Sequence, residues 1–105
     1  MPEYISLKKW LNDIVDEDAT AFEDAYWGQR PSARDTIPEI IKLLNIHSEP
    51  YTKGKLIELL GESEDKSVVP YLEKELDSVY EEVRNWAKLA IDALNRGDKW
   101  EKEPN

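Results

Sequence analysis

The sequence predicts an all-α fold, a single domain built from about three helical hairpins. Apolar residues recur at helical spacing along most of the chain, and no segment alternates apolar and polar residues as a half-buried strand would. The signals that separate the helices also repeat at a nearly constant period. With 105 residues, of which 40% are hydrophobic, the chain is long enough for one domain with a real core.

A helix expected over residues 4–16 precedes the first hairpin, and we expect it to cap one end of the stack. The first hairpin should consist of helices over 19–28 and 36–46. The apolar stripes of these three helices are Leu7, Trp10, Leu11, Ile14 and Val15; then Phe22, Ala25 and Tyr26; then Ile37, Ile40, Ile41 and Leu44.

The second hairpin should consist of helices over 51–62 and 67–77, and the third begins with a helix over 80–96. Their stripes are Leu56, Ile57 and Leu60; Val69, Leu72 and Leu76; and Val83, Ala87, Ala90, Ile91 and Leu94. Residues 1–96 then form the domain, and 97–105 form a polar tail. Trp100 in this tail has two readings, as a cover over the end of the stack or as an exposed side chain.

Start and stop signals flank these helices. Three pairs fit the capping box at a helix start: Thr20 with Glu23, Thr36 with Glu39, and Ser78 with Glu81. Three prolines fall in expected first turns, where no amide hydrogen bond is lost: Pro38, Pro50 and Pro70. Gly28 and Gly61 follow helical runs and are expected to be left-handed C-caps.

These signals recur along the chain. Gly28 and Gly61 are separated by about 33 residues, Pro38 and Pro70 by about 32, and Asn95 takes the glycine's place in the third copy. This period is typical of arrays in which each hairpin buries its apolar face against its neighbours.

The repeated residues resemble the HEAT-like repeat family, especially its short form from phycobilisome lyases. The matching residues are Leu60-Gly61, Asp65 and Val69-Pro70-Tyr71-Leu72 in one copy, and Val83-Arg84, Ala87 and Ala93-Leu94 in the next. The resemblance is good from Thr36 to Arg96 and weak before that, and residues 50–55 lack the Val-Arg pair. It implies a short right-handed α-solenoid.

The resemblance also implies roles for individual residues. Asp65 and Arg84 should be structural, because the family commonly forms ladders of such residues between repeats. The second helix of each hairpin should line a concave face. We therefore expect a partner-binding surface on that face that includes Glu39, Tyr71, Glu73 and Asp77.

The net charge of -9 makes nucleic acid a poor partner, because binding its backbone relies on Lys and Arg. A basic protein would be attracted, although the charge could also serve solubility alone. No stretch approaches the length of a membrane span and the first residues do not resemble a signal peptide, so we expect a cytoplasmic protein without a membrane partner.

Residue patterns of catalysis and cofactor binding are missing from the sequence. The glycines are too scattered for a phosphate-binding loop, there is no cysteine, and the single histidine, His47, lies in an expected turn. The carboxylates lack the spacing of a calcium loop and are read as solvated, including those of Glu62-Ser63-Glu64-Asp65. We therefore expect no enzyme activity, no metal and no cofactor.

The function predicted from the sequence is a non-catalytic protein-interaction module with an acidic concave face. A sharper version is an immunity-type protein that neutralises a basic toxin. The alternative is a chromophore-lyase-like or other enzyme-associated repeat protein, which only the family resemblance suggests.

Overall fold

The computed structural model describes residues 6–100 and confirms the all-α prediction for them, since it contains helices and no strand. The elements are α1 (Leu7–Ile14), α2 (Ala19–Trp27), α3 (Ala33–Ile46), α4 (Pro50–Gly61), the 3-10 turn η1 (Lys66–Val68), α5 (Val69–Glu75) and α6 (Glu81–Arg96). None of these helices is long and apolar enough to cross a membrane.

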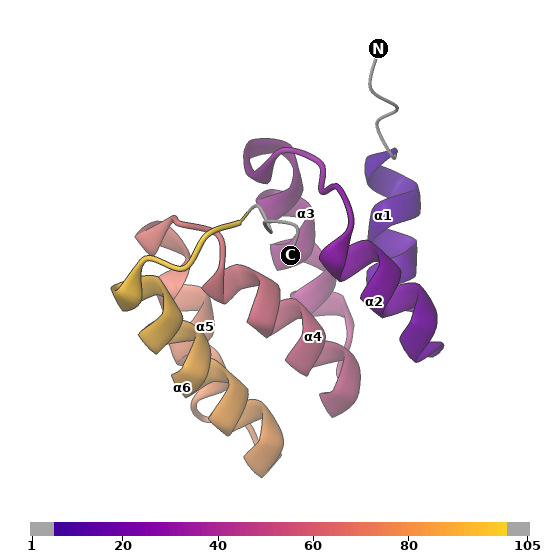
Figure 1. Cartoon of the computed structure of the whole chain (residues 1–105). Helices are drawn as coiled ribbons and strands as arrows, with labels where there is room; N and C mark the ends of the chain where they lie inside the picture. The colour runs from indigo at the N-terminus through magenta and orange to yellow at the C-terminus, as the bar shows by residue number, and fades with distance from the viewer. Residues whose placement is uncertain (1–5, 101–105) are drawn as a thin grey trace.

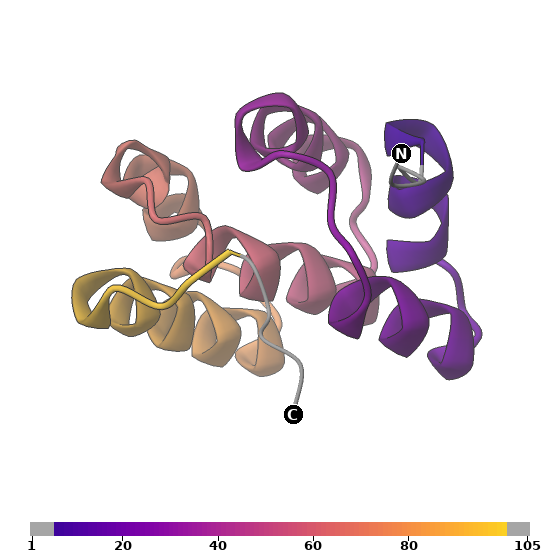
Figure 2. The same ribbon diagram turned by 45° about the horizontal axis from the view of Figure 1, so that its top comes forward.

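The helices lie in two layers, and successive helices along the chain belong to alternate layers. Helices α1, α3 and α5 form one layer, and α2, α4 and α6 form the other (Figures 1 and 2). Helix α4 packs against both α3 and α6 and is buried along most of its length. Its stripe is accordingly wider than predicted, with Leu59 buried beside Leu56, Ile57 and Leu60.

Polar side chains cap the N-termini of four of the helices. Those of Ser6, Asp18, Ser32 and Glu49 accept hydrogen bonds from the first free amides of α1 to α4. None of the three predicted capping boxes provides the side chain that caps its helix. Asp18 replaces Thr20, Ser32 replaces Thr36, and α6 starts at Tyr80 without a side-chain cap.

The start of α3 lies three residues earlier than predicted, at Ala33. Thr36 is therefore inside the helix, fully buried, and its hydroxyl donates to the Ser32 carbonyl at 2.7 Å. Pro38 lies in the helix interior, not in the first turn as predicted. Pro50 and Pro70 do lie in the first turns of α4 and α5.

The predicted left-handed C-caps are wrong at all three positions. Gly28 is extended, with φ of -86° and ψ of -167°, while Gly61 and Asn95 are still helical. The positive φ angles among the described residues belong to Gly97, at 82°, and Glu64, at 59°. Gly97 ends α6 by donating to the Ala93 and Leu94 carbonyls, two residues later than predicted.

Gly61 has a packing role instead. A Cβ atom placed on it would lie 2.8 Å from the Ala90 Cα on α6, so only glycine allows the two helices to come this close. A glycine is required at position 61, as the sequence suggested, but the reason is the close contact between α4 and α6 and not a left-handed C-cap.

The C-terminal residues 97–100, predicted to be part of a polar tail, turn back onto the helices. Trp100 is 3% exposed and lies in the same core cluster as Trp10, with their ring centroids 5.7 Å apart. Of its two readings, burial is the right one. Residues 101–105 of the predicted tail lie outside the described residues.

Candidate functional site

The predicted partner-binding residues Glu39 on α3, and Tyr71 and Glu73 on α5, belong to the layer of α1, α3 and α5. Tyr71 on α5 is 37% exposed and borders a groove of about 730 Å³ between α3 and α5. We call it the α3–α5 groove; its lining residues are Ala33, Arg34, Ile37, Pro38, Ile41, Lys42, Ser63, Asp65, Val68 and Tyr71.

The three predicted acidic residues are not among this lining. Glu39 borders a smaller groove between α1 and α3, and its carboxylate accepts a hydrogen bond from Lys42 at 3.1 Å. Glu73 is exposed on α5. Asp77 lies beyond that helix, which ends at Glu75 rather than at residue 77. Of the four predicted residues, the α3–α5 groove is therefore lined by Tyr71 and not by Glu39, Glu73 or Asp77.

The two predicted ladder residues each stabilise their own turn. Asp65 accepts from the Ser67 amide at 2.9 Å and caps η1, and hydrogen bonds from Ser67 hold the pKa of its carboxyl below the usual range. Arg84 donates to the Ser78 carbonyl at 2.7 Å, just before α6. Among the described residues, neither side chain bonds to another hairpin.

A second surface, on the opposite layer, was not predicted as a site. Trp86 on α6 lies against α4 at Gly54, where an added Cβ atom would be 3.0 Å from the indole Cδ1. The absence of a side chain at Gly54 thus allows the indole ring to pack against α4, and 36% of the Trp86 residue surface remains exposed. The apolar stripe predicted for this helix does not include Trp86.

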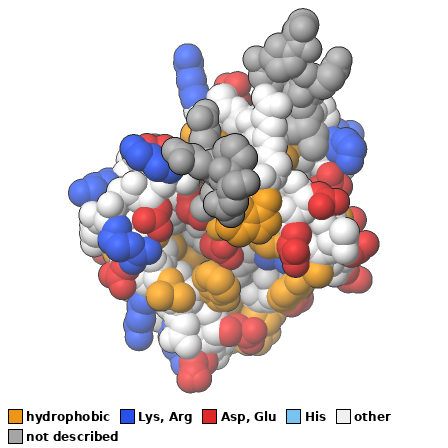
Figure 3. Space-filling view, viewed as in Figure 1, with side chains coloured by type: hydrophobic (Ala, Val, Ile, Leu, Met, Phe, Trp, Pro, Cys, Tyr) orange, Lys and Arg blue, Asp and Glu red, His pale blue; other side chains and the backbone are white. Residues whose placement is uncertain are grey.

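Two hollows flank this tryptophan. One, of about 260 Å³, is lined by Glu58, Glu62, Trp86, Leu89, Ala90, Ala93, Arg96 and Asp98. The other, of about 170 Å³, is lined by Phe22, Pro50, Tyr51, Gly54, Lys55, Glu58, Glu82 and Trp86. We call this surface, around Glu58, Glu82, Trp86 and Leu89, the α4–α6 face. Figure 3 shows hydrophobic side chains gathered across this side of the molecule with carboxylates beside them.

Carboxylates outnumber cations around the two hollows, and both cations are engaged. Lys55 donates to the Asp16 carbonyl at 2.7 Å, and its ammonium lies 4.3 Å from the centroid of the Tyr51 ring. Arg96 forms an ion pair with Asp98 at 3.1 Å. The Glu82 carboxylate, by contrast, is exposed and forms no hydrogen bond or ion pair with another described residue. The face therefore offers aromatic surface and negative charge to a ligand.

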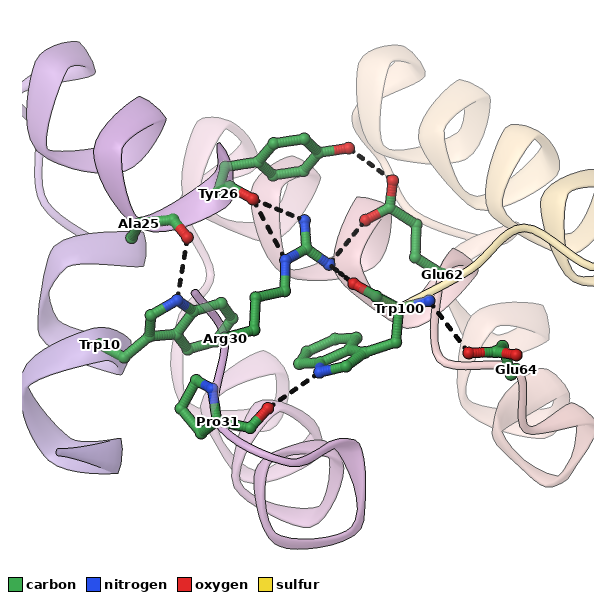
Figure 4. A network of polar contacts seen from close by, with 8 residues as sticks. All are labelled: Trp10, Ala25, Tyr26, Arg30, Pro31, Glu62, Glu64 and Trp100. Carbon is green, nitrogen blue, oxygen red and sulfur yellow. Dashed lines mark hydrogen bonds and ion pairs between the residues drawn. The ribbon is translucent and has the colours of Figure 1, made fainter. Parts of the chain in front are cut away.

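Behind this face lies a buried polar network (Figure 4). The Arg30 guanidinium donates to the Glu62 carboxylate at 2.9 Å and to the Trp100 carbonyl at 2.8 Å. It also donates to the Tyr26 carbonyl, while the Tyr26 hydroxyl donates to the other Glu62 oxygen. Burial, and then its hydrogen bond to Glu62, raise the pKa of the Tyr26 phenol far above the usual range.

The network corrects the reading of Glu62 as solvated, because this residue is 7% exposed. No periodicity distinguishes Arg30, which precedes Pro31 in a loop, or Glu62, which stands in an acidic run. Their role is visible only once residues distant in sequence are placed together.

Among residues 6–100, no group of three His, Cys, Asp or Glu side chains is placed to hold a metal ion. His47 follows α3 as its C-cap and is partly buried. Comparison of the chain with family models, with curated proteins and with solved structures finds no match in any of the three.

Proposed function

We propose that this chain is a non-catalytic protein-interaction module whose α4–α6 face binds a basic segment of a partner protein. The observation that carries the proposal is Trp86, exposed between hollows that are lined by carboxylates. A basic toxin, such as a nuclease, is one partner with this chemistry.

The scaffold we propose is a right-handed stack of HEAT-like hairpins. Two observations support it: the chain alternates between two helical layers, and related glycines and prolines recur about every 32 or 33 residues. Such stacks present rigid extended surfaces to their partners, and they bring no reactive group of their own.

An arginine or lysine of the partner would lie on the exposed side of the Trp86 indole. Such a cation over tryptophan contributes about 0.5 to 2 kcal/mol, depending on how far it is desolvated. Glu82 and Glu58 line the hollow beside the ring, and their carboxylates would accept hydrogen bonds from that cation. Leu89, 56% exposed, adds apolar surface at the same place.

The charge of the whole chain would act at longer range. A net charge of -9 attracts a basic partner and accelerates the encounter, and salt screens this effect beyond about 8 Å at physiological ionic strength. Affinity should therefore depend on Trp86, and the association rate on salt.

Two pairs of matched variants test this assignment against the site predicted from the sequence. Trp86 and Tyr71 are 36% and 37% exposed in opposite layers, and Glu82 and Glu73 are exposed carboxylates on α6 and α5. The probe is a fluorescein-labelled peptide rich in Arg and Leu, with binding followed by anisotropy at low and high salt.

Trp86→Ser and Glu82→Lys should each weaken binding by about tenfold, whereas Tyr71→Ser and Glu73→Lys should leave it nearly unchanged. If Tyr71→Ser and Glu73→Lys caused the loss instead, the partner site would be the one predicted on α5. Binding of the basic peptide that no variant alters would refute both sites.

A further inference from the structure

The α3–α5 groove is a separate surface, in the layer opposite to the α4–α6 face. Its floor is apolar: Val68 is 1% exposed and Ile37 6% exposed, with Ile41 partly buried beside them. Pro38 and Tyr71 add exposed apolar area at its edges. Its volume of about 730 Å³ exceeds that of the groove between α1 and α3 and that of each hollow beside Trp86.

Unlike the α4–α6 face, this groove has a basic edge. Arg34, Pro38 and Lys42 are spaced by four residues along α3 and so lie on one side of that helix. Arg34 and Lys42 are eight residues apart, which places them about 12 Å apart along the helix axis. In a chain of net charge -9, two cations along one apolar groove stand out.

These cations are available to a ligand. The Arg34 side chain is exposed and forms no hydrogen bond or ion pair with another described residue. Lys42 pairs only with Glu39, an exposed contact three residues away of the kind that contributes little to stability. The one carboxylate in the lining, Asp65, already accepts the Ser67 amide.

We propose that the α3–α5 groove binds an acidic amphipathic helix of a partner protein. The apolar stripe of such a helix would lie on Ile37, Ile41 and Val68. Carboxylates about two turns apart beside that stripe would reach Arg34 and Lys42. A strand is the poorer fit, because the described residues form no sheet edge that could pair with it.

The probe is a labelled amphipathic peptide of about 15 residues, the length at which isolated helices begin to form, with a leucine stripe flanked by glutamates. A second peptide carries lysines in place of the glutamates, and a third has the same composition as the first with its leucines shuffled. Anisotropy titrations with the full chain measure binding of all three.

The acidic amphipathic peptide should bind, and the shuffled peptide should bind at least about tenfold more weakly because it has no apolar stripe. Arg34→Glu and Lys42→Glu should each weaken binding several-fold, and the two together by at least about tenfold. Lys88→Glu is the matched control, since Lys88 is exposed on α6 and the substitution changes the net charge equally. Circular dichroism verifies that every variant is folded.

Equal binding of the acidic and shuffled peptides, or equal effects of Arg34→Glu and Lys88→Glu, would overturn the proposal. So would a dimer in sedimentation equilibrium that Arg34→Glu dissociates, because the groove would then hold a second copy of this chain. The basic peptide should still respond to Trp86→Ser in any of these cases, so failure here is distinct from failure of the α4–α6 face.

Discussion

Arg30 and Glu62 form a buried ion pair, 2.9 Å long, that joins the loop after α2 to the end of α4. Their side chains are 1% and 9% exposed. The pair is fully satisfied by its neighbours, since no buried side-chain nitrogen or oxygen of the described residues lacks a hydrogen-bond partner. Removing either partner of such a pair destabilises the fold, because the remaining charge is then buried without compensation.

Substitution of one member of this pair should therefore be costly. Arg30→Met or Glu62→Gln alone should lower the free energy of unfolding by about 3 to 5 kcal/mol, because each leaves the other charge buried and unpaired. The double variant should lose less than the sum of the two. Urea unfolding measures all three.

The exposed pair Lys9 and Asp13 provides the control for this cycle. It spans four residues of α1 at 3.0 Å, so Lys9→Ala should cost only about 0.3 to 0.5 kcal/mol. Additive losses for Arg30→Met and Glu62→Gln would mean that the buried pair is not coupled.

Trp100→Ala should destabilise the fold by about 3 to 5 kcal/mol, the usual cost of removing a buried tryptophan. The Trp100 indole donates to the Pro31 carbonyl at 2.9 Å and packs on Trp10, so protection from hydrogen exchange should fall first in α1 and α2. Trp27→Ala, at a residue that is 62% exposed, should cost below about 1 kcal/mol. A similar loss from both variants would contradict the burial of Trp100.

Gly61→Ala should destabilise the protein although alanine favours helices by about 1 kcal/mol over glycine. The added methyl group would meet the Ala90 Cα at 2.8 Å and its Cβ at 3.0 Å, and forcing α4 and α6 apart costs about 1 to 3 kcal/mol. Thermal unfolding measures whether Gly61→Ala lowers or raises the stability. Ala90→Gly in the same chain should relieve part of the loss, and a stabilised Gly61→Ala variant would refute the close contact.

Glu64 should stabilise the C-terminal residues in a pH-dependent manner. Its carboxylate accepts from the Trp100 amide and from Lys99, and these bonds lower its pKa below the ordinary value of 4.5. A lowered carboxyl pKa contributes stability above 4.5, and that stability is lost as the pH falls through the native pKa.

Glu64→Gln should therefore be less stable than the natural chain at neutral pH, with the difference closing in acid. Urea midpoints measured between neutral and acidic pH test this. Glu73→Gln is the control, because the exposed Glu73 carboxylate forms no hydrogen bond with another described residue and its substitution should change little at either pH. A constant gap for Glu64→Gln across the range would exclude the ionic contribution.

The sequence by itself determined that the chain is helical and approximately where each described helix lies. This succeeded because helix formation leaves a local record: the spacing of Ile37, Ile40 and Leu44 marks the buried side of α3, and Pro50 and Pro70 mark helix starts. The boundaries moved by a few residues, because an earlier residue such as Ser32 can cap the same helix as well as Thr36 could.

Only the tertiary structure decided what the special residues do. Arg30 donates to Glu62 and to the Trp100 carbonyl, which are 32 and 70 residues away in sequence. Trp86 packs against Gly54 on another helix. These contacts depend on how the two layers pack, so they leave no periodic signal in the sequence. The same packing places Arg34, Lys42 and Tyr71 along the α3–α5 groove and makes Gly61 a contact between helices.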